Sequence, residues 1–146
     1  MKASSVMKKL LPVVAVGFLA ACLFVAGWGL YGIVQHRRQT QTALSLLDDS
    51  KALKKYSETH EGFPEGRDIF FEEIVGRLKA PKTGVLIAED AWGHPLHYTS
   101  NGRHFLLWSL GRNGAIDRWP AGGKRKGYDV DLVIYDGKFW QLAHGL

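Results

Sequence analysis

The sequence has little cysteine and, over its first 47 residues, no negatively charged side chain. Cys22 is the only cysteine among 146 residues, so no disulfide can form within the chain. The first acidic residue is Asp48, although the chain has 14 aspartates and glutamates in total. The 19 lysines and arginines are scattered among these acids, and no nucleic-acid-binding motif accompanies them. The net charge of +5 therefore gives no reason to expect a nucleic-acid partner.

The sequence also lacks the motifs of common enzymes. It contains no nucleophile elbow, no metal-binding helix motif and no phosphate-binding loop. The best catalytic material is His94, His97 and His104, with Asp90 as a candidate partner. On a strand, residues three apart point to opposite faces, so His94 and His97 would not meet. We therefore expect no enzymatic activity.

Residues 10–34 form a run of 25 residues without a charge. As a helix this run would be about 37 Å long, enough to cross a hydrocarbon core of about 30 Å. Trp28 and Tyr31 lie near its far end, where aromatic rings favour the headgroup region, and Arg37 and Arg38 follow. We expect residues 1–9 in the cytoplasm and a membrane-spanning helix at 10–34, although the flanking charges nearly balance.

Two other interpretations of the apolar run stay open. A cleaved signal peptide usually has a shorter apolar region and a small-residue cleavage site. The segment Leu19-Ala20-Ala21-Cys22 is similar to a lipoprotein processing box, but further apolar sequence follows it. An uncleaved anchor fits the length of the run better than either alternative.

Residues 35–60 have helical periodicity and predict a stalk helix that continues from the apolar run. Apolar residues spaced by about three and four predict one buried stripe: Leu44, Leu47, Ala52, Leu53 and Tyr56. Charged residues fall on the other side: Asp48, Asp49, Lys51, Lys54 and Lys55. Gly62-Phe63-Pro64 would end this helix. A second helix is expected next, capped by Asp68 and ended by Pro81. Its buried face would comprise Ile69, Phe70, Ile74, Val75 and Leu78.

The remaining part of the 61–146 domain alternates short apolar runs with turn signals. Four strands are expected at 96–99, 104–109, 131–135 and 138–142. Asn101-Gly102 and Asp136-Gly137 are typical of hairpin turns and would join these strands in pairs. Two hairpins predict an antiparallel sheet, and the stalk helix is available to cover its apolar face. The expected fold class is therefore α+β, with a membrane helix that continues into a stalk packed on a small sheet.

The connection between Leu110 and Asp129 is long, rich in glycine and expected to lack secondary structure. Such loops are usually functional or disordered. The connection and its surroundings supply oxygen atoms from Asp90, Ser109, Asn113, Asp117, Asp129 and Asp131. Calcium takes six to eight oxygen ligands, so a calcium ion would order the loop. Alternatively, this is a solvated loop whose Asp and Asn residues serve turns, and the positive charges of Lys124-Arg125-Lys126 favour that interpretation.

Three motifs follow one another in a fixed order. They are Asp90-Ala91-Trp92-Gly93-x-Pro95, Ser109-Leu110-Gly111-x-Asn113-Gly114 and Asp129-x-Asp131-Leu132. Together they resemble the globular domain of the major pseudopilin (the G subunit) of type II secretion systems, over roughly residues 39–142. Leu53-x-x-Tyr56 followed by Gly62-Phe63-Pro64 is similar to the stalk exit of that family. The resemblance implies a helix anchored in the bacterial inner membrane and a small, pilin-like periplasmic domain.

The resemblance also implies a bound calcium ion and polymerisation into a short pilus-like fibre. By position, the metal ligands would be Asp90, the carbonyl of Leu110, Asn113, Asp129 and Asp131, with Ser109 and Asp117 as weaker candidates. The partners would be other pseudopilin or secretion-machinery subunits, further copies of the chain, and the lipid bilayer.

Two features depart from the family pattern. Asn113 stands where the family usually has Asp, which keeps an oxygen but removes a charge. Residues 17–22 lack the Thr and the Glu of the prepilin peptidase site Gly-Phe-Thr-Leu-x-Glu, and that Glu helps to register neighbouring subunits in the membrane. Two functions therefore compete. One is a pseudopilin-like structural component of a type II secretion or type IV pilus-like machine. The other is an uncleaved, single-pass, calcium-stabilised binding module that does not polymerise.

Overall fold

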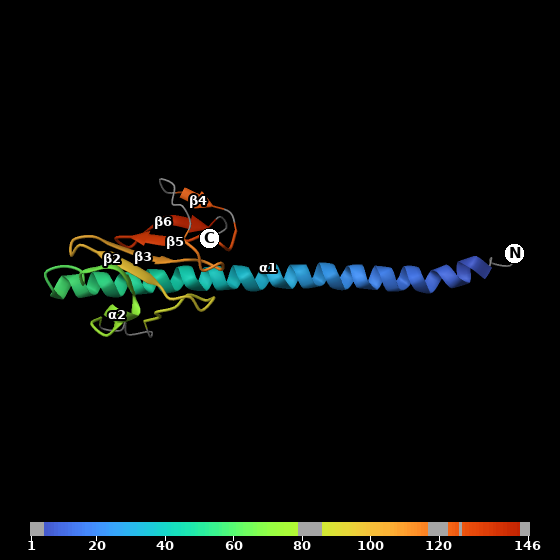
Figure 1. Cartoon of the computed structure of the whole chain (residues 1–146), viewed down its shortest axis with the longest axis horizontal. Coiled ribbons are helices and arrows are strands. Elements are labelled where there is room, and N and C mark those ends of the chain that lie inside the picture. Colours follow the sequence, from blue (N-terminus) through green and yellow to red (C-terminus); the bar gives the residue numbers. More distant parts are fainter. Residues whose placement is uncertain (1–4, 79–85, 117–122, 126, 144–146) are drawn as a thin grey trace. The chain divides into compact units, whose positions relative to one another are not determined.

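A computed structural model of the chain describes residues 5–78, 86–116, 123–125 and 127–143 (Figure 1). The elements, in chain order, are α1 (Ser5–Thr59), β1 (Gly66–Phe70), α2 (Glu72–Val75), β2 (His97–Ser100), β3 (Phe105–Ser109), β4 (Gly123–Arg125), β5 (Leu132–Tyr135) and β6 (Lys138–Ala143). The chain divides into two compact units, Met1–Gln35 and His36–Leu146.

The first unit is the apolar part of α1. Its large apolar side chains are exposed, from Val14 at 63 % to Val34 at 47 %. Among the described residues, α1 is the one helix long and apolar enough to cross a membrane. By length and composition it is a candidate membrane span, and an N-terminal signal sequence has the same properties.

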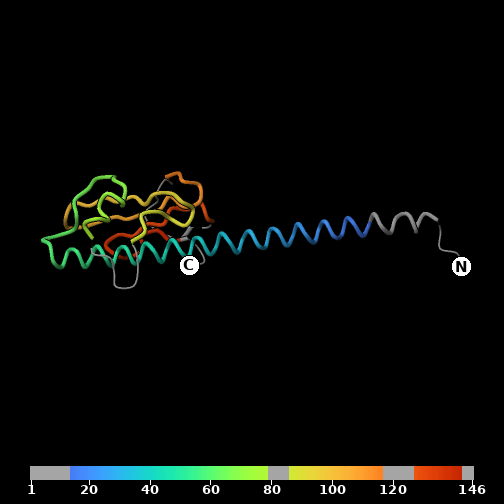
Figure 2. Tube along the Cα trace, turned by 90° about the horizontal axis from the view of Figure 1, so that it is seen from below, coloured from blue at the N-terminus to red at the C-terminus, as the bar shows by residue number. Residues whose placement is uncertain are grey.

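The second unit combines the end of α1 with a six-stranded sheet in the order β1-β2-β3-β5-β6-β4. Neighbouring strands are antiparallel from β1 to β6, whereas β4 runs parallel to β6. The end of α1 lies along one face of the sheet, and α2 lies next to the edge strand β1 (Figures 1 and 2). The α+β class and the helix packed on a small antiparallel sheet are therefore confirmed.

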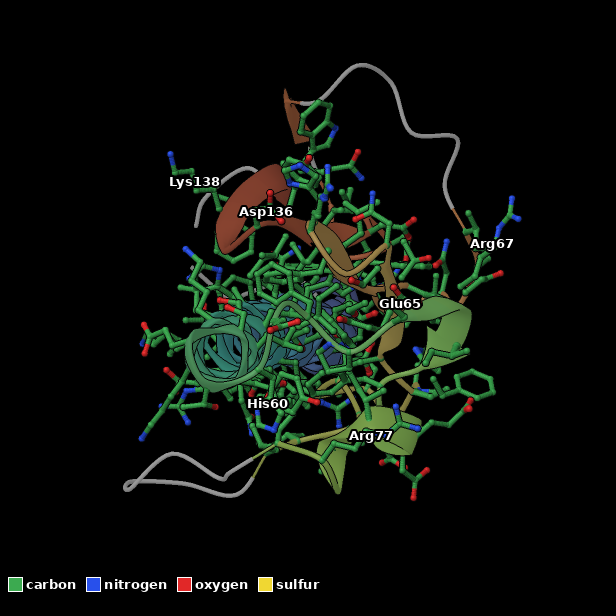
Figure 3. All side chains as sticks on the ribbon, turned by 90° about the vertical axis from the view of Figure 1, so that its left-hand side faces the viewer. His60, Glu65, Arg67, Arg77, Asp136 and Lys138 are labelled. Atoms are coloured by element: carbon green, nitrogen blue, oxygen red, sulfur yellow. The ribbon has the colours of Figure 1, made fainter. Side chains whose placement is uncertain are left out.

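The core of this unit lies between α1 and the sheet. The helix contributes Leu46 and Leu53, both fully buried. The strands contribute alternate residues, as the two-residue repeat of a strand requires: Tyr98, Phe105, Leu107, Leu132 and Ile134. Each fully buried side chain of this size stabilises the fold by about 1.5–3 kcal/mol. Charged side chains such as Arg67 and Lys138 point away from this interior (Figure 3).

The predicted second helix is wrong in its first part. Residues 66–70 form strand β1 instead of a helix, and α2 covers only Glu72–Val75. Asp68 is not a cap: its φ is 50°, and its N–H donates to Thr99 Oγ1 at 3.2 Å. Phe70, expected to be buried, is 48 % exposed, whereas Ile74 is buried as predicted. The segment forms a strand because it pairs with β2, a long-range contact that local propensity does not reveal. Pro81 lies outside the described residues.

The predicted buried stripe of α1 is confirmed at four of its five positions: Ala52 and Leu53 are buried, and Leu47 and Tyr56 pack partly buried against the core. Leu44 is 58 % exposed, whereas Asp49, expected outside, is 2 % exposed. The buried face follows Thr42, Leu46, Asp49 and Leu53, at helical spacings of four and three. The four predicted strands are present as β2, β3, β5 and β6. Each of their ends coincides with the predicted residue or differs from it by one.

Candidate functional site

The candidate site is the junction where the connection between β3 and β5 begins and ends. Asp90, which is 6 % exposed, forms one part of it. Its Oδ1 accepts the N–H groups of Trp92 and His94, both at 2.9 Å. Its Oδ2 accepts the Ser109 hydroxyl at 2.7 Å. The carboxylate therefore closes its own turn and ties that turn to the end of β3.

Ser109 extends this network into the connection. It is fully buried, and its Oγ accepts the N–H of Gly111 at 3.1 Å while donating to Asp90. The Nδ1 of His94 lies 2.9 Å from the carbonyl oxygen of Gly111. Because a carbonyl only accepts, Nδ1 carries the proton in this contact. The first and second motifs of the sequence thus meet through hydrogen bonds.

Gly111 lies against the far end of the connection. Its φ is 66°, and a Cβ at this position would lie 2.8 Å from the carbonyl oxygen of Val130 and 3.0 Å from that of Asp129. A side chain would meet backbone atoms, which cannot move aside as a flexible side chain can. The second and third motifs are therefore in contact, and the contact requires glycine.

An ion pair joins the same two ends. Arg112 Nε donates to Asp129 Oδ1 at 2.7 Å, and Arg112 Nη2 donates to Asp129 Oδ2 at 2.8 Å. The backbone N–H of Arg112 donates to the carbonyl of Tyr128 at 2.9 Å. The two side chains are 35 % and 48 % exposed. Arg112 is the junction residue that sequence reasoning missed, because it occupies the variable position of its motif.

The structure describes three of the other predicted metal ligands. Asp131 is fully buried at the start of β5, and its carbonyl accepts Gln141 Nε2 at 3.0 Å. Leu110 is 8 % exposed. Asn113 is exposed, and its Oδ1 accepts the N–H of Ala115 at 3.1 Å. Asp117 lies outside the described residues.

The connection was expected to lack secondary structure, and this expectation is wrong. Residues Gly123–Arg125 form β4, which pairs with β6 in the register Gly123↔Gln141. Strand pairing therefore holds part of the connection. Nothing in the local sequence signals a three-residue strand whose partner, β6, follows the next strand β5.

This donor set does not fit a calcium ion as it is arranged. Calcium needs six to eight oxygens directed at one point. Both oxygens of Asp90 accept hydrogen bonds from the chain, and both oxygens of Asp129 accept from Arg112. In the part of the chain that the structure describes, no three His, Cys, Asp or Glu side chains are grouped as metal ligands would be. Calcium binding stays a prediction from the resemblance.

The three histidines considered as catalytic material are in different places. His94 contacts Gly111, as described above. The ring of His97 stacks on Trp108 with centroids 5.3 Å apart. His104 Nδ1 lies 2.6 Å from Asp136 Oδ2, and its ring stacks on Tyr135. Each imidazole has its own structural contact, and the three do not form one site.

No protein-family model, curated protein or solved structure matches this chain.

Proposed function

We propose that this chain is a membrane-anchored, pseudopilin-like structural component of a type II secretion or type IV pilus-like machine, which acts through contacts with other subunits. The observation that carries the proposal is the junction of the three motifs. Asp90 bonds to Ser109, and Gly111 packs against Asp129, so residues far apart in the sequence meet at one place. The three motifs resemble one family in sequence and also meet in space. Together these two observations support a pseudopilin-like domain more than the sequence resemblance alone.

The architecture is consistent with this role. A long apolar helix continues into a segment that packs on a sheet, which is the arrangement that the resemblance implies. The domain would lie in the periplasm, with α1 anchored in the bacterial inner membrane. Alkaline phosphatase fused after Leu146 tests this orientation, because the enzyme is active only where its disulfides form. An inactive fusion that is made in normal amounts would place the domain in the cytoplasm.

A second function is favoured by the stalk surface. Within residues 36–59, Leu44 is the only large apolar side chain that is exposed. The neighbouring exposed positions Gln41 and Asp48 are polar. A helix that packs between many subunits in a fibre would be expected to present a wider apolar stripe outside the membrane. This surface favours an uncleaved, anchored binding module that does not polymerise.

Photocrosslinking separates the two functions. A photoreactive benzoylphenylalanine at Leu44, in the full chain expressed in a bacterial membrane, reports what lies against the exposed face of the stalk. The same group at Arg103, an exposed residue of the β2–β3 turn, is the control. The structural role predicts adducts from Leu44 at multiples of the mass of the chain or with one defined partner subunit. If Leu44 gives no more adducts than Arg103, the stalk makes no subunit contacts and the second function stands.

A further inference from the structure

We infer that the ion pair between Arg112 and Asp129, and not a divalent cation, closes the connection between β3 and β5. This inference disagrees with the calcium ion that the sequence resemblance implies. It concerns how the domain holds its own motifs together, so it does not depend on the partners proposed above.

The geometry of the pair is that of a strong charge-assisted contact. The guanidinium of Arg112 meets the Asp129 carboxylate with two parallel bonds of 2.7 and 2.8 Å. Such bidentate pairs add direction as well as charge, because the planar fork of arginine matches the two oxygens. The backbone bond from Arg112 to Tyr128 holds the two segments in the same register. The positive charge that Asp129 needs is thus supplied by the chain itself.

The second carboxylate of the junction accepts hydrogen bonds from within the chain. Asp90 accepts two backbone N–H groups and the Ser109 hydroxyl. Oδ1 already accepts two N–H groups, so a cation at this oxygen would displace a donor that is then left unpaired in a buried place. Each such loss is unfavourable, because a buried donor without an acceptor keeps its full desolvation penalty. Asp90 and Asp129 are therefore two separately satisfied carboxylates, not two ligands of one ion.

The backbone leaves the two ends of the connection in direct contact. Gly111 is close enough to Val130 and Asp129 that one methyl group would not fit between them. A metal ion is not needed to bridge segments that already touch. The ion pair lies at the partly exposed edge of this contact, where it would be weakened by salt but would be indifferent to chelators.

Thermal unfolding of the full chain in detergent tests the inference. We would compare the melting temperature in calcium chloride, in magnesium chloride and in EDTA. The expected result is the same melting temperature in all three, because nothing that binds only the folded chain is added or removed. Arg112→Gln should lower it by roughly 3 °C, as loss of a partly exposed bidentate pair would. Arg103→Gln, which removes an exposed arginine without a described partner, should leave it unchanged.

Three further variants identify the partner. Asp129→Asn should lower the melting temperature by a similar amount, and the double variant should lose less than the sum of the two single losses. Arg112→Lys should restore only part of the loss, since an ammonium group cannot form the bidentate contact. A melting temperature that rises by several degrees with calcium would overturn the inference, above all if Arg112→Gln keeps that rise. Additive losses in the double variant would also overturn it. The calcium comparison on the unaltered chain decides the matter even if a variant fails to fold.

Discussion

Asp49 on α1 and Ile87 in the segment before the Asp90 turn are joined by a hydrogen bond from the Ile87 N–H to the Asp49 carboxyl group. Asp49 is 2 % exposed, and within the described residues its Oδ2 has no hydrogen-bond partner. Burial raises the pKa of Asp49 from 3.8 to about 7, the Ile87 hydrogen bond opposes this shift, and the charge of Asp48 adds to it. A carboxyl group in this position is unfavourable when ionised, so we expect the stability of the domain to depend on pH.

The first prediction is that the domain is less stable above about pH 7 than near pH 5. The folded chain holds the Asp49 proton more tightly than the unfolded chain, whose pKa is near the usual 3.8. The contribution of this proton to the free energy of unfolding is therefore complete below the unfolded pKa and is lost as the pH rises through about 7. The rise in the pKa from 3.8 to about 7 corresponds to at most about 4 kcal/mol in the free energy of unfolding. Thermal unfolding across this pH range measures the loss.

A neutral side chain at Asp49 should remove this pH dependence. Asp49→Asn is expected to raise the melting temperature at about pH 8 and to change it little near pH 5, where the carboxyl group is already protonated in the folded chain. Glu58→Gln is the matched control, because Glu58 is an exposed acidic residue on the same helix. An equal effect of Asp49→Asn at both pH values would show that the substitution acts through packing and not through charge.

Gly111→Ala should destabilise the domain more than Gly93→Ala. Both glycines have positive φ, 66° and 86°, so both substitutions carry the backbone strain of a left-handed residue, about 1–2 kcal/mol. Only at Gly111 does the new Cβ also meet backbone atoms, at 2.8 Å from the Val130 carbonyl oxygen, whereas nothing lies within 4 Å at Gly93. Denaturant unfolding of the two variants isolates the close contact. Equal losses would mean that the motifs can separate at this point without cost.

The hairpin turns of the sheet are determined by local sequence. The turns Asn101-Gly102 and Asp136-Gly137 are encoded within a few residues, and both appear where predicted, with Gly102 at a φ of 84° and Gly137 at 81°. Strand β1 was missed because a short apolar run does not distinguish a helix from a strand until its partner is known. On α1 two positions were predicted wrongly: Leu44 is exposed, and Asp49 is buried against its preference.

In the candidate site, too, local features could be predicted from the sequence and long-range contacts could not. The sequence identified the oxygen-bearing residues at the junction, and Asp90, Ser109 and Asp129 do lie there. It did not indicate which groups these oxygens bind. Arg112 reaches a carboxylate 17 positions away, and that pairing depends on a turn at Gly111 and on strand β5 being placed next to β3. Ligand chemistry can thus be read from residue types, but the identity of the counter-charge requires the fold.

Tyr98→Phe should lower the stability of the domain, because it removes a hydrogen bond to the segment that follows α1. The hydroxyl of Tyr98, fully buried in β2, donates to the carbonyl of Pro64 at 2.8 Å. The same burial raises the pKa of Tyr98 to about 12, so the group stays a donor over the working pH range. Its removal leaves a buried carbonyl without this partner, at a cost of about 1–3 kcal/mol in the free energy of unfolding. Tyr135→Phe, at the surface, is the control and should change it little. Equal effects would show that the Pro64 contact contributes nothing specific.

A charge in the apolar part of α1 should prevent stable membrane association. Leu23 is 66 % exposed, and an arginine there would face lipid in a spanning helix, at about 2.5–3.5 kcal/mol in insertion measurements. Leu23→Arg is therefore expected to move the chain from the membrane pellet to the soluble fraction on alkaline extraction, while Leu23→Ile should stay in the pellet. If the unaltered chain itself is extracted, or is found with a new terminus beyond the apolar run, the helix is a signal sequence and does not anchor the mature protein. This measurement comes before any test of fibre assembly, because subunits that leave the membrane cannot pack through that helix.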